Sequence, residues 1–316
     1  MLDQVMHQDE GVRALRWVLK GTLSKPLLLV GPCGVGKRFA VTQLTREMFC
    51  SGSKTDDCKC NDCVQLHHDV HPDLWQVAAG EKEIGIGESR DAIAATGSYP
   101  SQAPYRVFVL DGADRMTAPA ANALLKLLEE PPPTTRFFLI AELPHLVIPT
   151  IRSRCGLVPF HSWPEESVLS KISQYEKDPT KALVYVRLGE GSVGEAVKLW
   201  GSGRLSLRDI VVSVLQSAKN RNYSQLFTSF EILAKDLPLS LHFLNLVLHD
   251  LIMLSYGIPR RVNLDIEETL SGLNYGVPVE RWFDLRRQLQ VVRDVYRKTK
   301  INLGFHMRSI IIDAFV

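Results

Sequence analysis

Short apolar runs alternate with amphipathic stretches through the first half of the chain. Four runs have the length and composition of buried β-strands, at residues 27–30, 74–78, 107–110 and 137–141. Residues 117–130 carry apolar positions at helical spacing, with Thr117 suited to the N-cap and prolines after the end. Strands that alternate with helices predict an α/β fold whose parallel, doubly wound sheet is covered on both faces.

Helical periodicity covers the two ends of the chain. Residues 1–24 have apolar positions at helical spacing, and so do most residues after 164. The pattern there predicts short helices with a turn at residues 189–192, followed by a helical bundle that is interrupted near residues 238, 259 and 276–278. We therefore predict an α/β domain at 1–163, a small helical domain at 164–205 and an all-α domain at 206–316.

A glycine-rich segment joins the first predicted strand to the helix after it. Residues 31–37 read GPCGVGK, which is the G-x-x-x-x-G-K spacing of a phosphate-binding loop. Small residues at Gly31, Gly34 and Gly36 let backbone N–H groups converge on an anion, while Lys37 reaches the terminal phosphates at a helix N-terminus. We therefore predict a nucleotide site of these four residues together with Arg38, whose alternative role is to pair with a phosphate oxygen, and Asp111.

The residue after the lysine departs from the pattern of an ATPase. A Ser or Thr hydroxyl at this place ligates Mg²⁺, but Arg38 has no acceptor atom and a fixed positive charge. Asp111, at the end of an apolar strand, can still orient a cation, whereas Gly112 stands where a Glu would polarise the attacking water. We expect a loop that binds ATP or ADP weakly or statically and hydrolyses neither.

Composition narrows the class of protein. The 316 residues are 45% hydrophobic and 23% charged with a formal net charge of +2, which is ordinary for a globular protein and does not demand a nucleic-acid partner. No apolar run approaches the ~20 residues of a membrane helix, and the N-terminus lacks the layout of a signal peptide. We expect a cytoplasmic protein without a membrane partner, whose six cysteines are reduced.

Four of the cysteines share a short polar segment after the phosphate-loop helix, and they are Cys50, Cys58, Cys60 and Cys63. The C-x2-C half of their spacing is usual for structural zinc, whereas the C-x-C half is less usual. Three histidines are alternatives for one ligand, namely His67, His68 and His71. Unrelated thiols on a polar loop are the simpler alternative. We predict a structural zinc site at residues 50–63, with four protein ligands and no open position.

The stretch 107–155 resembles the clamp-loader branch of the AAA+ proteins. Its motifs are NALLKLLEEPP at residues 122–132 and TIRSRC at 150–155, and the cysteine-bearing insertion followed by HPD at 71–73 also fits. The resemblance is specific over residues 20–165 and rests on helical architecture alone beyond about residue 200. It implies an AAA+ P-loop domain, a small lid domain and a helical collar for oligomerisation. Within the branch, the chain is most similar to the delta-prime subunits of bacterial DNA polymerase III.

Four departures separate the chain from the ATPase subunits of that branch. Besides Arg38 and Gly112, Ala141-Glu142 stands at the polar sensor position, and Gly194 replaces the arginine of the second sensor. Arg154 of the SRC motif is retained. In the family this arginine reaches ATP on the neighbouring subunit, where a guanidinium stabilises transition-state charge. The resemblance thus implies a stator that donates Arg154 in trans, and pairing of Arg154 with a local acid is the alternative.

These assignments imply specific partners. The chain would join clamp-loader ATPase subunits and a clamp-opening subunit in a hetero-oligomer, which loads the sliding clamp on primed DNA during DNA replication. Lys37 and Asp111 favour the alternative of a self-sufficient clamp-loader ATPase of the gamma/tau type. A third hypothesis is a zinc-bearing adaptor that binds DNA directly through C-terminal basic residues, which are Arg286, Arg287, Arg293, Arg297, Lys298, Lys300 and Arg308.

Overall fold

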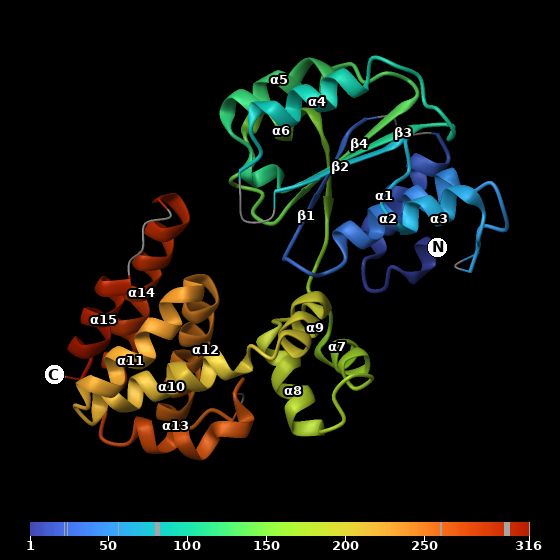
Figure 1. Cartoon of the computed structure of the whole chain (residues 1–316). Coiled ribbons are helices and arrows are strands. Elements are labelled where there is room, and N and C mark those ends of the chain that lie inside the picture. Colours follow the sequence, from blue (N-terminus) through green and yellow to red (C-terminus); the bar gives the residue numbers. More distant parts are fainter. Residues whose placement is uncertain are drawn as a thin grey trace. The chain divides into compact units, whose positions relative to one another are not determined.

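The computed structural model describes residues 1–21, 23, 25–55, 57–79, 83–259, 261–299 and 304–315. The chain divides into two compact units, Met1–Trp163 and Pro164–Val316. Each unit is described by itself below (Figure 1). The first boundary falls where the sequence places the end of the α/β domain.

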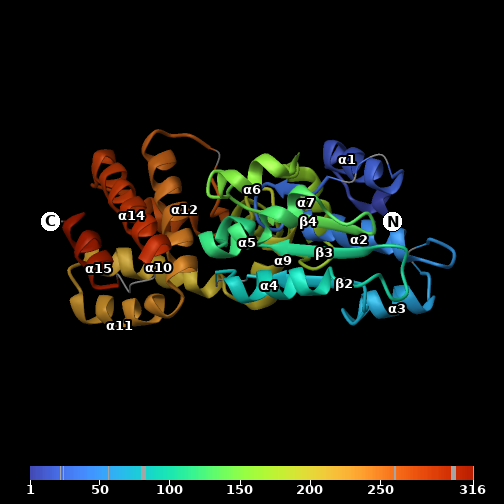
Figure 2. The same ribbon diagram turned by 90° about the horizontal axis from the view of Figure 1, so that it is seen from above.

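A parallel sheet of five strands forms the centre of the first unit. Its strand order is β2-β3-β4-β1-β5. The strands are β1 (Leu27–Val30), β2 (Leu74–Ala78), β3 (Arg106–Asp111), β4 (Thr135–Ala141) and β5 (Gly156–Pro159). The four predicted strands are confirmed, and Figures 1 and 2 both show β2 beside β3. The fifth strand was not predicted, because β5 is a short edge strand whose Leu157 is exposed.

Helices cover both faces of this sheet, as the alternation of elements predicts. One layer contains α1 (Asp9–Leu19), α2 (Lys37–Phe49) and α3 (Asn61–His67), and the other contains α4 (Ile86–Ala95), α5 (Ala118–Glu129) and α6 (Pro149–Arg154) (Figure 1). Alternate residues of β1 point to opposite layers. Leu27 and Leu29 pack with α1 and α2, while Leu28 and Val30 pack with α5 and α6. The AAA+ type of fold is therefore built on two cores that share one sheet.

Local signals place most boundaries of these helices. Thr117 caps α5 by accepting a hydrogen bond from the Ala120 N–H, as its position before the helix predicts. The predicted N-terminal helix is shorter than expected, because a 3-10 turn at Leu2–Gln4 precedes α1. After β2, helix α4 begins at Ile86.

The second unit is helical throughout the residues that the structure describes. Its helices are α7 (Glu165–Ile172), α8 (Pro179–Leu188), α9 (Val193–Ser202), α10 (Leu205–Lys219), α11 (Tyr223–Leu233), α12 (Leu237–Ser255), α13 (Glu267–Asn274), α14 (Val279–Thr299) and α15 (Gly304–Asp313). The predicted turn at 189–192 separates α8 from α9. This unit contains the predicted small helical domain and the predicted collar.

Polar contacts connect the two predicted parts of this unit. Arg187 in α8 donates to the backbone carbonyl of Arg261, and the His242 ring lies 3.3 Å from the Leu188 carbonyl. Within residues 206–316, the buried Arg208 in α10 pairs with both carboxylate oxygens of Asp265, at 2.7 and 2.8 Å. The division of this unit near residue 205 stays a prediction.

One stretch of the second unit has the length and composition of a membrane span. It is Tyr223–Ser255, although no such run was expected from the sequence. In its most apolar window, 61% of the residues are buried inside the fold, as in the core helix of a soluble protein. The 3-10 turn Ala234–Asp236 also divides the stretch into α11 and α12. These features identify a core element of the helical unit.

Candidate functional site: a phosphate loop, an arginine and a cysteine cluster

The phosphate loop connects β1 to α2, as its sequence predicts. Gly31 has φ +151°, and a Cβ there would lie 2.1 Å from the carbonyl oxygen of Phe160. Gly36 has φ +105° at the N-cap of α2, where only glycine fits without strain. Gly34 also has a positive φ. The loop borders a cavity of about 290 Å³, which the predicted residues Gly34, Gly36, Lys37, Arg38 and Asp111 line.

Lys37 is folded back onto its own loop. Its Nζ donates hydrogen bonds to the carbonyl oxygens of Gly31 and Pro32, both at 2.6 Å. Only 7% of the residue is exposed. This burial lowers the pKa of Lys37, and the nearby acidic groups, Cys33 and Glu142 first, offset only part of the effect. A bound phosphate would have to displace these two carbonyl oxygens before it could pair with the Lys37 ammonium.

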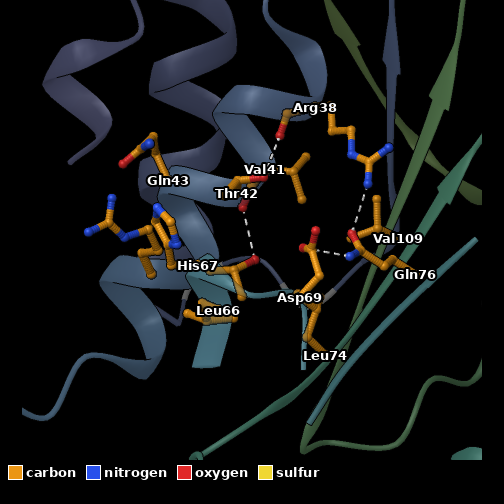
Figure 3. Close-up of a pocket in the computed structure, with 12 residues that line it drawn as sticks. Arg38, Val41, Thr42, Gln43, Leu66, His67, Asp69, Leu74, Gln76 and Val109 are labelled. Atoms are coloured by element: carbon orange, nitrogen blue, oxygen red, sulfur yellow. Dashed lines mark hydrogen bonds between the residues drawn. The ribbon is translucent and has the colours of Figure 1, made fainter. Parts of the chain in front are cut away.

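Arg38 points to the acid that would orient Mg²⁺. Its Nη1 lies 3.9 Å from Oδ2 of Asp111, and its Nη2 donates to Oε1 of Gln76 at 3.2 Å. Gln76 in turn donates to Oδ1 of Asp69 at 2.8 Å (Figure 3). A fixed positive charge therefore stands near the cation position. Arg38 also lines a second cavity of about 290 Å³, between α2, α3 and β2.

Gly112 departs from an ATPase in conformation as well as in chemistry. It has φ +110° directly after β3. A Cβ at this position would lie 2.7 Å from Cβ of Ala79 and 2.8 Å from Nη2 of Arg115. The positive φ and the side chains of Ala79 and Arg115 therefore make a larger residue at position 112 strained, which the sequence alone did not reveal.

At the sensor position at the end of β4, Ala141 is apolar, while Glu142 lines the phosphate-loop cavity. Ala141 is buried at 1% exposure. The backbone N–H groups of Glu142 and Leu143 donate to Oδ2 of Asp114 at 3.3 and 3.1 Å. Asp114 thus holds the loop after β4 in place. Gly194 lies in α9 of the second unit, whose placement relative to the loop is not determined.

Arg154 ends α6 and pairs with an acid of its own chain. Its Nε and Nη2 both donate to Oε2 of Glu129, at 3.2 and 3.1 Å. Its Nη1 donates to the Thr150 carbonyl at 3.2 Å. The Arg154 side chain is 31% exposed. The local pairing that the sequence left as an alternative is present, and the side chain remains accessible to solvent. Glu129 was not recognised from the sequence.

The four predicted cysteines converge in space. Their Sγ atoms all lie within 4.8 Å of one another, with Cys50 at 3.5 Å from Cys58 and 3.9 Å from Cys60. Zn–S bonds of about 2.3 Å in a tetrahedron require sulfurs about 3.8 Å apart. The cluster can therefore bind a metal ion with little rearrangement. Gly52 lies against it, since a Cβ there would meet the Cys58 sulfur at 2.8 Å.

The surroundings of the cluster favour a thiolate and exclude the histidines. Hydrogen bonds, first from the Cys60 backbone, lower the pKa of Cys58 to about 6, whereas burial raises that of Cys63. Among the described residues, no histidine joins the metal-competent group. His71 instead accepts a hydrogen bond from the Asp73 N–H at Nδ1, and its Nε2 lies 3.5 Å from Asp62.

In the HPD motif at residues 71–73, Asp73 is a buried acceptor for backbone N–H groups. Its fully buried carboxylate accepts hydrogen bonds from the N–H groups of Ser101, Gln102 and Ala103, at 2.7 to 2.9 Å, and it contacts Arg106. Burial acts to raise the pKa of Asp73, but these donors outweigh it and hold the pKa below its usual value. Asp73 therefore organises the loop that enters β3.

The C-terminal basic residues that motivate the direct DNA-binding hypothesis are partly engaged within the chain. Arg286 donates to Asn245, Arg287 pairs with Asp284, and the Arg308 guanidinium lies over the ring of Phe227. The side chains of Arg297 and Lys298, and all of Lys300, lie outside the described part of the structure. Arg286, Arg287 and Arg308 therefore each have a partner within the chain.

Comparison with known proteins connects this geometry to a family. A family model described as "DNA polymerase III, delta subunit" matches residues 8–164. DNA polymerase III subunit delta' of Bacillus subtilis is 32% identical over 184 residues, which cover 57% of this chain and 55% of that protein. The Escherichia coli subunit delta' is 28% identical over 254 residues, which cover 78% of this chain and 75% of that protein.

A solved structure agrees with the fold. The DNA polymerase III gamma subunit-related protein of Thermotoga maritima superposes with a TM-score of 0.56 and 18% identity, over 98% of this chain and 100% of that one. At this identity the likeness shows the fold alone. The family match covers the region that holds the phosphate loop, the cysteine cluster and Arg154. The chain belongs to the delta-prime family of DNA polymerase III clamp-loader subunits.

Proposed function

We propose that this chain is a clamp-loader stator, which does not hydrolyse ATP itself and donates Arg154 to ATP on a neighbouring subunit. The observation that carries the proposal is a phosphate-loop cavity whose cation position faces Arg38, in the same unit as an accessible arginine at the end of α6. A guanidinium placed against a γ-phosphate in trans can contribute ~10³–10⁵ in rate.

We infer that the chain works within a hetero-oligomer that loads the sliding clamp. Its neighbours would be clamp-loader ATPase subunits and a clamp-opening subunit, which together load the sliding clamp on primed DNA in the cytoplasm. The helices of residues 206–316 would form the collar that joins them. The Bacillus subtilis and Escherichia coli relatives are DNA polymerase III delta' subunits by name, and the alignment with the first covers 55% of its length.

Nucleotide in the chain's own loop would be static. Lys37 already has two carbonyl partners, and Arg38 brings a positive charge where a hydroxyl would hold Mg²⁺. ATP or ADP would therefore bind weakly, and its affinity would not depend on Mg²⁺. The cysteine cluster would hold one structural zinc ion, because four thiols close a tetrahedral site.

Arg154→Ala tests the stator role in the reconstituted clamp loader. We expect the DNA-stimulated ATPase of the complex to fall by about a hundredfold or more at the site that faces this chain, given the size of arginine-finger effects. Arg152→Ala, two residues earlier in α6, is the matched control. Wild-type ATPase in the Arg154→Ala complex would exclude the proposed role.

The gamma/tau-like motor is the second candidate, and Lys37 and Asp111 motivate it. It requires the purified chain to hydrolyse ATP alone at a rate that Lys37→Ala abolishes. The geometry at Arg38 and Gly112 opposes this, since neither residue can perform the step that the motor assigns to its position.

A further inference from the structure

The contact between Arg154 and Glu129 uses the donors that a phosphate would use. One carboxylate oxygen, Oε2 of Glu129, accepts from both Nε and Nη2, at 3.2 and 3.1 Å. This Nε and Nη2 edge is one of the guanidinium edges that bind carboxylate and phosphate oxygens. The remaining nitrogen, Nη1, is held separately by the Thr150 carbonyl of the same helix. Glu129 thus occupies the Nε and Nη2 donors of Arg154, while the hydrogen bond from Nη1 to Thr150 is separate.

The backbone on both sides of this contact is fixed. Leu128, directly before Glu129, is 1% exposed, and the same holds for Ile151 in α6. Cys155, directly after Arg154, is also buried. Leu128, Ile151 and Cys155 all belong to the hydrophobic core beneath α5 and α6. A change of partner for Arg154 therefore requires only rotation of two surface side chains.

The contact is also weak enough to exchange. The side chains are 31% and 59% exposed, and exposed ion pairs contribute little to stability because water and salt screen them. A nucleotide phosphate in a closed subunit interface carries more charge in a drier place, so it competes well for the same guanidinium.

We propose that Glu129 is a placeholder for the neighbour's terminal phosphate. It holds Arg154 in a defined position in the free chain and releases it when ATP occupies the adjoining site. This inference rests on the proposed role of Arg154 in trans. Glu129 is then a positioning residue that lowers the apparent affinity of the neighbour's site for ATP, because ATP must displace it.

The test uses the reconstituted complex with Glu129→Gln, which removes the charge and keeps the shape. We expect the KM for ATP to fall about two- to fivefold, the range for an exposed ion pair, with kcat unchanged. The shift should shrink as salt rises, because salt screens the competing carboxylate. Glu130→Gln, at the next and exposed residue, is the matched control and should behave as wild type. Glu129→Ala gives a second variant at the same position.

A double-mutant cycle separates this inference from the stator role. The effect of Glu129→Gln should vanish in the Arg154→Ala background. An unchanged KM, a reduced kcat, or a shift that persists without Arg154 would overturn the placeholder. If Arg154→Ala alone leaves the ATPase at the wild-type level, the stator role fails and the inference fails with it.

Discussion

At the scale of single residues, backbone conformation decides more than side-chain identity at position 112. The sequence shows only that a carboxylate is missing there. The structure shows a left-handed backbone with Ala79 and Arg115 against the place of a Cβ. The packing after β3 therefore disfavours a glutamate at this position. The same scale includes Asp73, whose one carboxylate satisfies three backbone donors of a loop 28 to 30 residues further along.

Gly112→Glu restores the letters of an ATPase motif, and we expect it to restore no activity. The positive φ and the close contacts should lower the free energy of unfolding by about 1–3 kcal/mol, with the new carboxylate displaced from the cavity. Arg38→Thr in the same chain should not rescue hydrolysis. Urea unfolding and ATP turnover measure both effects.

Gly87→Ala provides the control for this experiment. Gly87 lies inside α4 with open space around its Cβ direction, so alanine should leave stability unchanged or raise it by up to about 1 kcal/mol. ATP turnover by a normally stable Gly112→Glu chain would contradict the expected strain.

Asp73→Asn should lower the free energy of unfolding at pH 7 by about 2–4 kcal/mol, because it leaves buried backbone donors without a charged acceptor. The pKa of Asp73 is depressed in the folded chain. Its stabilisation is therefore complete above the unfolded pKa of about 3.9, and it is lost as the pH falls through the folded value. Urea titrations from pH 7 to pH 3 should show a shallower loss in the variant.

The exposed Asp91 in α4 serves as the control, since Asp91→Asn removes one carboxylate without a buried partner set. Equal pH slopes for wild type and Asp73→Asn would show that the Asp73 carboxylate does not carry this dependence.

At the scale of elements, the cysteine cluster joins the end of α2 to the start of α3. Cys50 follows α2 directly, Cys60 is the N-cap residue of α3, and Cys63 lies in its first turn. A segment this short and polar cannot form a core of its own, so a metal ion would supply the cross-links that fix it. Gly52 allows the chain to pass close to the sulfurs.

The purified chain should contain one zinc ion, which Cys58→Ser and Cys63→Ser remove. We expect each of these variants, and the chelated wild type, to unfold at a lower temperature. Gly52→Ala should weaken zinc retention against a chelator by about 10–100-fold, because its Cβ pushes on the Cys58 sulfur.

Cys33→Ser is the matched control, since Cys33 lies in the phosphate loop outside the cluster. Metal analysis and thermal unfolding on the same samples measure the outcome. Full zinc content in Cys63→Ser would mean that the four thiols are not the ligand set.

At the scale of the whole molecule, the chemistry gathers in one of the two units. The phosphate loop, Arg154 and the cysteine cluster all lie in Met1–Trp163, while the second unit is helical over its described residues. Within the first unit, Arg38 and Arg154 differ in their partners. Arg38 faces a semi-buried acid at the loop, and Arg154 faces an exposed one at the surface. The first arrangement suits a resting site, and the second suits exchange with another molecule.

Local sequence pattern predicts much of the fold and of the candidate site. Four of the five strands, the cap of α5, the phosphate loop and the four cysteines all follow from residue type and spacing. β5 could not be predicted because an exposed Leu157 between Gly and Pro lacks a buried-strand pattern. The three histidines stayed open as ligands, because spacing does not show which side chains turn toward one point.

The sequence by itself determined the fold class, the phosphate loop and the metal-competent segment, because each depends on residues close together in the chain. Only the tertiary structure decided that Arg38 faces Asp111, that the Ala79 and Arg115 side chains crowd Gly112, that Asp73 holds residues 101–103 and that Glu129 holds Arg154. These contacts join residues far apart in sequence. They depend on strand order and register in a parallel sheet, which hydrophobic pattern along one strand does not specify.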